Sequence, residues 1–270
     1  MPSEYAQKAV LSVAGLWFSY PDKPDVLKNV SLTVIEGERV GLIGTNGCGK
    51  TTLLMGICGV LKPSAGEVMV LGRPASDGNF LPDVGLVFQN PDDQLFCPSV
   101  RDDVAFGPQN MRLSKDEVEA RVTEALSAVG ALALADRPAH HLSGGEKRMV
   151  SIASVLAMRP QLIMYDEPSA SLDIRSRRQL IGLLKAAQET MLIASHDLEL
   201  VLEVCSRVVL MDDGKLIADG DPRKIMNDDR LMEAHGQERP HSLTPHQLPH
   251  RGEATGRCGN FITTSQEEVY

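Results

Sequence analysis

The sequence has few of the features that mark secreted, membrane-spanning or nucleic-acid-coating proteins. It contains five cysteines, an odd number with no C-x-x-C pair, which predicts free thiols in a reducing compartment rather than a disulfide framework. No apolar run approaches the roughly 20 residues that cross a bilayer. Residues 1–4 lack the basic start of a signal peptide. We therefore expect a cytoplasmic protein that serves a membrane only through a partner.

Basic residues are also scarce relative to acidic ones. The chain has 27 Lys and Arg against 36 Asp and Glu, which gives a net charge of −9. A surface of this sign is not suited to coating nucleic acid, so we expect no nucleic-acid partner. The length of 270 residues and the hydrophobic content of 43% allow one large domain with a subdomain and a tail.

The stretch from Gly44 to Thr52, GTNGCGKTT, fits the phosphate-loop pattern G-x-x-x-x-G-K-[ST] in full. It follows the pattern of a buried strand at 39–43 and precedes that of a helix at 53–57. In this context backbone N–H groups bind phosphate, Lys50 reaches the β- and γ-phosphates, and Thr51 offers its hydroxyl to Mg²⁺. The residues predicted here to bind nucleotide are Gly44, Thr45, Asn46, Gly47, Cys48, Gly49, Lys50, Thr51 and Thr52.

The hydrophobic patterns indicate an α/β core with a helical insertion. Strands are predicted at 10–18, 26–30, 32–35, 39–43, 67–71, 84–88, 162–165, 190–194, 208–211 and 215–218. From residue 89 to 142 strand patterns stop, and Ser114 and Glu117 have capping-box spacing before a helix that ends at Gly130. We therefore predict a P-loop NTPase core with an antiparallel β subdomain and an inserted helical subdomain at about 90–142.

The end of the chain differs in composition from the rest. After about residue 235, apolar residues become fewer while Pro, His, Gln, Ser and Thr increase. We predict a domain over 1–235 and a poorly ordered tail over 236–270. Prolines interrupt any helix that could align the histidines into a metal site. The histidines concerned are His235, His241, His246 and His250.

A second nucleotide signal is the run 162–167, LIMYDE. An acidic residue at the end of a buried strand can hold Mg²⁺ directly or through water, and Asp166 has that position. Glu167 follows it and can orient and deprotonate an attacking water. Taken alone, the run could also be a strand followed by a solvated acidic loop.

The third signal is LSGGEKR over 142–148. Ser143, Gly144 and Gly145, followed by Glu146, present a second helix N-terminus that can bind phosphate. One chain would thus have two phosphate-binding helix ends but one phosphate loop. A head-to-tail dimer resolves this mismatch, because each ATP could lie between the loop of one subunit and the LSGGE of the other. A capping box from Ser143 to Glu146 is also expected, but it does not explain two successive glycines.

With these three motifs in order, residues 5–235 resemble the ATP-binding cassette (ABC) family. The resemblance implies that Tyr20 stacks on adenine, although a core tyrosine is the alternative. It also implies that Gln89 contacts Mg²⁺ and the attacking water, and that the loop to Asp173 crosses to the partner subunit. His196 matches the switch histidine on the γ-phosphate, whereas a lone histidine after a strand can equally be structural.

A finer resemblance lies at 87–96, 102–107, 138–148 and 155–158, which look like the ATPase subunits of energy-coupling factor (ECF) importers of the cobalt type. It implies two membrane partners, a scaffold protein and a substrate-binding subunit, with nickel or biotin as alternative cargoes. Leu95 and Phe96 would form an apolar groove for a partner helix if exposed, or pack into the helical subdomain if not.

Two other classes of function stay open. A soluble ABC protein of translation or DNA repair would usually carry two cassettes or a long coiled coil, and the sequence shows neither. A regulator or kinase that uses the phosphate loop alone would not need LSGGE, Asp173 and His196. The sequence does not decide between a homodimer and a pair of related ATPases.

Overall fold

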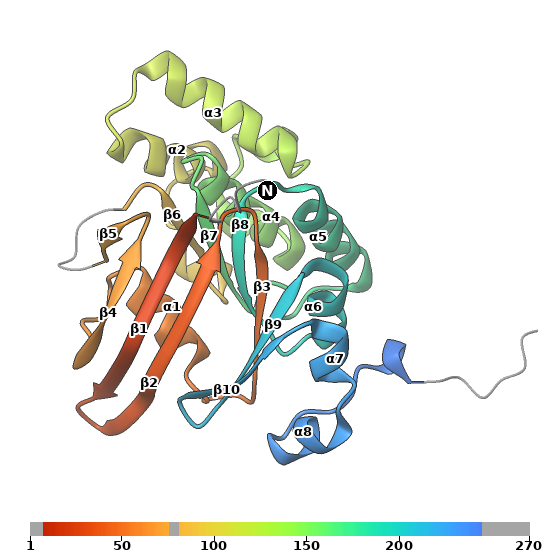
Figure 1. Ribbon diagram of the computed structural model, residues 1–270. Helices are drawn as coiled ribbons and strands as arrows, with labels where there is room; N and C mark the ends of the chain where they lie inside the picture. Colours follow the sequence, from red (N-terminus) through yellow and green to blue (C-terminus); the bar gives the residue numbers. More distant parts are fainter. Residues whose placement is uncertain (1–7, 76–80, 245–270) are drawn as a thin grey trace, which may run out of the picture.

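The central element of the fold is a six-stranded sheet (Figure 1). The computed structural model describes residues 8–75 and 81–244. In sheet order the strands are β10 (Lys215–Gly220), β9 (Arg207–Asp212), β3 (Arg39–Ile43), β8 (Thr190–Ala194), β7 (Leu162–Asp166) and β6 (Val84–Val87). The strands from β9 to β6 run parallel, and β10 is antiparallel to β9. Five carboxyl ends therefore meet at one edge of the sheet.

A four-stranded antiparallel sheet forms the second layer. Its order is β2 (Lys23–Ile35), β1 (Ala9–Tyr20), β4 (Ala65–Val70) and β5 (Arg73–Pro74). Helix α1 (Lys50–Ile57) lies against β2, β4 and β7, and so fills the space between the two sheets. The apolar residues of β1, which include Leu11, Val13 and Leu16, are buried in this layer.

The central sheet has a hydrophobic core on each face, because successive strand residues point to opposite sides. Leu162 and Met164 of β7 belong to the core with α1 and the antiparallel sheet. Ile163 and Tyr165 belong to the core on the other face. There the sheet is covered by α4 (Gly144–Leu156), α5 (Ile174–Ala186) and α6 (Leu198–Val204) (Figure 1).

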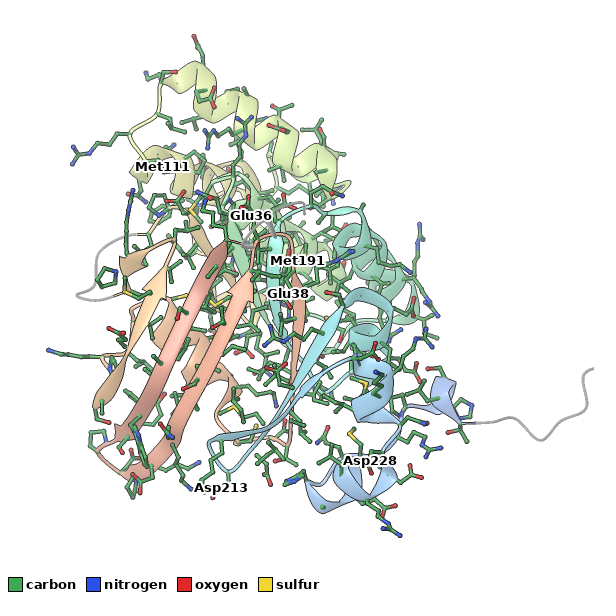
Figure 2. All side chains as sticks on the ribbon, in the orientation of Figure 1. Glu36, Glu38, Met111, Met191, Asp213 and Asp228 are labelled. Carbon is green, nitrogen blue, oxygen red and sulfur yellow. The ribbon has the colours of Figure 1, made fainter. Side chains whose placement is uncertain are left out.

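Side chains fill the space between these layers (Figure 2). Glu38 and Met191 lie at the amino ends of β3 and β8, where the Met191 N–H donates to the Glu38 carbonyl at 2.9 Å. Asp213 lies at the opposite end of the sheet, in the turn between β9 and β10. That opposite end carries the carboxyl termini of the parallel strands.

The segment over residues 90–142 is helical. It contains α2 (Val100–Asn110), α3 (Lys115–Ala128) and short 3₁₀ helices at Pro91–Asp93, Leu132–Leu134 and Ala139–His141. The Ser114 hydroxyl caps α3, but the Glu117 carboxylate pairs with Arg121 at 2.7 Å, so only the serine half of the expected capping box forms. The predicted α/β fold with an inserted helical subdomain is confirmed.

The structure differs from the sequence prediction at the start of the tail. After α7 (Pro222–Met226) and α8 (Asp229–Ala234), the chain packs back on the domain as far as residue 244. The Arg239 guanidinium pairs with Asp229, and the Ser242 N–H donates to Glu199 at 2.9 Å. These contacts order a segment that composition alone assigned to the tail. The rest of that prediction, residues 245–270, lies outside the described residues.

Candidate nucleotide-binding site

A cleft of about 350 Å³ opens at the carboxyl edge of the central sheet. Sheets of this kind bind ligands at that edge. The residues that line it come from β1, β2, the phosphate loop, α1 and the ends of β6, β7 and β8. They are Tyr20, Lys23, Val26, Asn46, Gly47, Gly49, Lys50, Thr51, Thr52, Gln89, Asp166, Glu167 and His196.

The strand order explains why residues far apart in sequence meet here. The neighbours β3, β8, β7 and β6 are each followed by one part of the site. In that order the parts are the loop that begins at Gly44, His196, the pair Asp166 and Glu167, and Gln89. The sequence predicted these residues but not the order in which they lie along the sheet. That order differs from chain order, since β8 lies between β3 and β7.

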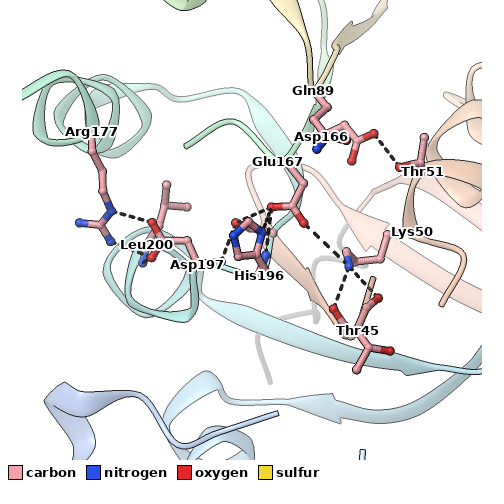
Figure 3. Close-up of polar contacts among 12 residues, drawn as sticks. Thr45, Lys50, Thr51, Gln89, Asp166, Glu167, Arg177, His196, Asp197 and Leu200 are labelled. Carbon is pink, nitrogen blue, oxygen red and sulfur yellow. Dashed lines mark hydrogen bonds and ion pairs between the residues drawn. The ribbon is translucent and has the colours of Figure 1, made fainter. Parts of the chain in front are cut away.

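The phosphate loop is held in a backbone conformation that requires glycine. Gly44 has φ 152°, and a Cβ there would lie 2.1 Å from the carbonyl oxygen of Met211. The Lys50 ammonium donates to the carbonyls of Gly44 at 2.8 Å and Thr45 at 3.2 Å, so its side chain folds over the loop (Figure 3). Since α1 begins at Lys50, its unpaired N–H groups face the cleft and can bind phosphate.

The residues that line the cleft do not include three of the predicted loop residues: Gly44, Thr45 and Cys48. Burial raises the pKa of the Cys48 thiol above its ordinary value, although Lys50 acts against this. Cys48 is therefore a protonated, buried part of the loop at neutral pH.

Thr51 and Asp166 form a set of oxygen donors beside Lys50. The Thr51 hydroxyl donates to Asp166 Oδ2 at 2.7 Å, and Asp166 Oδ1 is buried with no hydrogen-bond partner among the described residues. Burial raises the pKa of Asp166, and the neighbouring Glu167 raises it further, whereas the Thr51 hydrogen bond lowers it. A buried carboxylate oxygen without a partner, next to a hydroxyl, fits the oxygen ligands that Mg²⁺ prefers.

The Glu167 carboxylate is fixed by the residues that follow β8. Its Oε2 accepts from the His196 N–H at 3.1 Å and lies 2.7 Å from His196 Nδ1 (Figure 3). Its Oε1 lies 3.8 Å from the Lys50 ammonium. Glu167 also has φ 46°, in a region that residues other than glycine seldom adopt. A carboxylate held in this way at the edge of the cleft can orient and deprotonate a water.

A salt bridge that we did not predict holds the His196 loop. Arg177 of α5 donates to both carboxylate oxygens of Asp197, at 2.6 and 2.8 Å. Asp197 also caps α6 by accepting from the Leu200 N–H at 3.0 Å. Burial acts to raise the pKa of Asp197, but these hydrogen bonds outweigh it and lower the pKa. The sequence signal was present, since an aspartate directly precedes the apolar run of α6.

Tyr20 is half-buried at the end of β1 and lines the cleft. Its hydroxyl lies 3.4 Å from that of Thr52, and its ring meets the edge of Phe18 at 4.8 Å. Tyr20 therefore lines the cleft and is not a fully buried core residue, and its stacking on adenine stays a prediction.

The LSGGE segment begins α4 and forms the expected capping box. The Glu146 N–H donates to Ser143 Oγ at 3.3 Å, and the Ser143 N–H donates to the Glu146 carboxylate at 2.8 Å. A Cβ on Gly145 would lie 2.3 Å from the Ser176 hydroxyl, so packing against α5 explains this glycine. A Cβ on Gly144 would meet nothing within 4 Å. Packing therefore requires only one of the two glycines.

The LSGGE residues do not join the phosphate-loop cleft of their own chain. Ser143, Gly145 and Glu146 line a different cleft together with Asp173. Asp173 caps α5 by accepting from the Ser176 N–H at 2.8 Å. The single chain thus separates the predicted residues into two groups.

The two apolar side chains beside the Gln89 loop have different environments. Leu95 is buried in the core, whereas Phe96 is 65% exposed. Phe96 meets Phe106 of α2, itself 47% exposed, edge to face with ring centroids 5.0 Å apart. An exposed aromatic pair therefore lies next to the loop that carries Gln89.

The described residues, 8–75 and 81–244, contain neither a candidate membrane span nor a metal-binding cluster of His, Cys, Asp and Glu side chains. No helix there has the length and apolarity needed to cross a membrane. Within the same residues, no group of three or more His, Cys, Asp or Glu side chains is arranged to hold a metal. His235 is paired with Asp212 at 2.9 Å, and two other tail histidines, His246 and His250, lie outside the described residues.

The chain is similar to known proteins along most of its length. The family model described as "ABC transporter" matches residues 27–170. A protein of Synechocystis sp. that carries the provisional name of an ABC transporter ATP-binding protein is 55% identical over 86% of this chain and 82% of its own. The energy-coupling factor transporter ATP-binding protein EcfA of Methanocaldococcus jannaschii is 45% identical over 81% of each chain. The solved structure of CbiO1 from Clostridium perfringens, described as part of the ABC transporter complex CbiONQ, has a TM-score of 0.74 at 36% identity, covering 84% of this chain and 94% of its own.

Proposed function

Because the chain belongs to the ABC transporter family and is an ATPase of that family, we propose that it energises an ECF-type importer for a transition-metal ion, with cobalt as the cargo. Its partners would be an ECF membrane scaffold protein and a substrate-binding membrane subunit, and it would lie on the cytoplasmic face of the cell membrane. Similarity to EcfA and to CbiO1 supports this type of importer. Nickel and biotin remain the alternative cargoes.

The site residues have separate tasks in ATP hydrolysis. Lys50 and the N-terminus of α1 bind the phosphates, while Tyr20 stacks on adenine. Glu167 takes a proton from the attacking water, and His196 holds that carboxylate in place and contacts the γ-phosphate. Mg²⁺, when bound, neutralises charge that develops on the phosphates. Thr51, Gln89 and Asp166 would hold it.

The second group of residues completes the site in a dimer. Ser143, Gly144, Gly145 and Glu146 would contact the γ-phosphate of the ATP bound by the partner subunit, and the Asp173 loop would cross the interface. This arrangement explains why Gly144 has open space around it. ATP would then close the dimer, hydrolysis would open it, and the membrane partners would use that motion. Because both groups are intact in this sequence, a homodimer is possible, as is a pair of related ATPases.

The observation that carries the transport proposal is the exposed aromatic pair, Phe96 and Phe106. Neighbouring aromatic side chains that are exposed on a surface are typical of a protein contact. Phe96 follows Gln89 closely in the chain, and the Phe96 N–H donates to Asp103 at 2.9 Å. A partner helix on this patch could therefore sense the state of the nucleotide site.

Co-purification from the native cell tests the proposal. The tagged chain should recover a membrane scaffold and a substrate-binding membrane subunit from gently solubilised membranes. The double variant Phe96→Ser/Phe106→Ser should recover at least about tenfold less of both, because it removes the apolar contact. Val60→Ser is the matched control, since Val60 is an apolar side chain that is 68% exposed and lies outside the helical segment 90–142. All three proteins should hydrolyse ATP alike.

Two outcomes would contradict the proposal. If the tagged chain recovers only ribosomes, DNA or soluble proteins, the chain is a soluble ABC ATPase without a role in transport, and the proposal of an importer is wrong. If membrane subunits are recovered, uptake of cobalt, nickel and biotin by cells lacking this chain decides the cargo. If these cells lose only nickel uptake or only biotin uptake, the proposal that cobalt is the cargo is wrong.

A further inference from the structure

The candidate for a further role is Arg148, in the second turn of α4. It is a charged residue only 1% exposed, and it does not line the nucleotide cleft. One guanidinium nitrogen donates to the carbonyl of Phe88 at 2.6 Å, and another donates to that of Gln89 at 2.5 Å. Its Nε is buried without a hydrogen-bond partner among the described residues. Such a group is costly to bury, so its presence calls for a role.

From this geometry we propose that Arg148 is a positioning residue for Gln89. Its hydrogen bonds link the backbone of Gln89 to α4, so that Gln89 moves when α4 moves. The inference rests on the proposed role of Gln89 at the Mg²⁺ and water. It concerns a residue outside the LSGGE segment and outside the nucleotide cleft.

Two neighbouring contacts fasten the same segment to the same helix. The Gln94 side chain accepts from the Phe88 N–H at 3.1 Å and donates to the Ser151 carbonyl at 2.7 Å. Lys147 pairs with Asp92 at 2.6 Å. Residues 88–94 are therefore tied to α4 by three side chains, and Arg148 is the one that holds Gln89 itself.

The shape and charge of arginine suit this task. A planar guanidinium offers parallel donors that can reach two successive carbonyls, whereas a lysine ammonium is a point charge on a flexible stem. Burial lowers the pKa of Arg148 to about 10 against the opposing effect of Asp166, so the side chain remains charged at neutral pH. Lysine at this position should keep the charge and lose the double contact.

A third cleft, distinct from the nucleotide cleft and from the one that Ser143 and Asp173 line, shows how a movement of α4 could reach Gln89. It measures about 400 Å³ and lies between the Gln89 loop, the first turns of α4 and residues 170–172. Gln89 lines this cleft and also the nucleotide cleft, whereas Gly144 and Arg148 line this cleft but not the nucleotide cleft. Movement of α4 when Gly144 meets the partner's ATP would thus displace Gln89 toward or away from the nucleotide of its own subunit.

The test compares Arg148→Lys with Arg121→Lys in the full chain. Arg121 is the matched control, because it donates to two successive carbonyls, Ala157 and Met158, at the far end of α4. We expect Arg148→Lys to lower kcat about tenfold or more with KM for ATP changed less than about twofold, since a small displacement of a catalytic group is costly while binding contacts remain. Arg121→Lys should leave both parameters within about twofold.

A second pair of measurements separates positioning from a general loss of structure. In a Gln89→Ala background, Arg148→Lys should lower kcat by less than about twofold, because the group it positions is gone. In the protein without nucleotide, hydrogen exchange of residues 88–95 should be faster in Arg148→Lys and unchanged in Arg121→Lys. If Arg148→Lys does not fold, Arg148→Gln, which keeps one amide donor, takes its place.

Several results would overturn the inference. The inference is wrong if Arg148→Lys keeps the kcat of the wild type. It is also wrong if the fold-decreases in kcat caused by Arg148→Lys and Gln89→Ala multiply in the double variant. An unchanged rate of hydrogen exchange of residues 88–95 in Arg148→Lys would overturn it as well. A Gln89→Ala protein with normal kcat would instead overturn the proposed role of Gln89, and hydrogen exchange would still decide whether Arg148 holds the segment.

Discussion

At the scale of single residues, the two carboxylates that end β7 have opposite environments. Glu167 has partners in His196 and Lys50, whereas Asp166 has one buried oxygen with none among the described residues. Burial raises the pKa of Asp166 above the ordinary value of about 3.9. In the chain without ligand, burial therefore disfavours the charged form of Asp166, which a bound cation would favour.

The first prediction concerns Asp166→Asn. Because the pKa of Asp166 is higher in the folded than in the unfolded chain, ionisation lowers the stability of the folded chain as pH rises through that range. The neutral variant avoids this loss. We expect its free energy of unfolding at pH 7, without nucleotide or Mg²⁺, to be higher by about 1 kcal/mol, with hydrolysis reduced at least about 100-fold.

Denaturant unfolding at pH 4 and pH 7 checks this prediction, and the gap between variant and wild type should widen toward pH 7. Thr51→Ser is the control, because it keeps the hydroxyl that donates to Asp166. If the variant is less stable than the wild type at pH 7, the Asp166 carboxylate stabilises the ligand-free fold, and the prediction is wrong.

At the scale of elements, the first turn of α4 combines a packing glycine with an exposed one. The space at Gly145 is taken by Ser176 of α5, whereas that at Gly144 is open. The capping box between Ser143 and Glu146 already secures the start of the helix. The openness of Gly144 is therefore not needed for folding, and it remains available for a phosphate.

The second prediction compares alanine at these two positions. Gly145→Ala should lower the free energy of unfolding by about 1–3 kcal/mol, because its Cβ would overlap Ser176. Gly144→Ala should change it by less than about 0.5 kcal/mol but lower kcat at least about tenfold, because a methyl group would obstruct the partner's phosphate.

Unfolding and ATPase assays on both variants check this prediction. The double variant Gly145→Ala/Ser176→Gly serves as the control and should regain part of the lost stability. Normal hydrolysis by Gly144→Ala would contradict a role for this helix end at the partner's ATP.

At the scale of the whole molecule, the single chain contains two incomplete sites. The phosphate-loop cleft holds Lys50 and Glu167, while the LSGGE turn and Asp173 line a separate cleft. A second chain in head-to-tail orientation would bring the two groups together. In the proposed dimer, whose stability would depend on ATP, both sites would be complete.

The third prediction is that Glu167→Gln, with Mg²⁺ and ATP, forms a dimer that retains ATP. The amide keeps the shape of the side chain but cannot take the proton from water, so the closed state should persist. Light scattering after gel filtration measures the mass. The wild type should be mainly monomeric after it hydrolyses its ATP, and Glu167→Gln without nucleotide should be monomeric too. A monomer that nevertheless retains ATP would rule out the homodimer.

Three elements, α2, α6 and β5, were not predicted, because local sequence patterns were insufficient to identify them. Helix α2 contains Gly107 and Pro108, which signal a break, yet Ser99 caps it and Val100 and Val104 anchor it in the core. Helix α6 has only seven residues, and β5 only two. Tertiary contacts stabilise these short segments, and propensity carries little information about them.

Sequence alone determined the residue types that the chemistry requires. The spacing of Gly44, Lys50 and Thr51 places a lysine and a hydroxyl at a helix N-terminus, and the apolar run before Asp166 places a carboxylate at a strand end. These relations are local, so the chain order specifies them. The same holds for the capping box that begins α4.

Only the tertiary structure decided which of these segments, each predicted locally, come into contact. The insertion of β8 between β3 and β7 brings His196 to Glu167, and burial of Arg148 connects α4 to Gln89. The salt bridge from Arg177 to Asp197 likewise joins α5 to the loop after β8. Such contacts depend on strand order and on which face of a helix is buried, and both result from packing the whole domain at once.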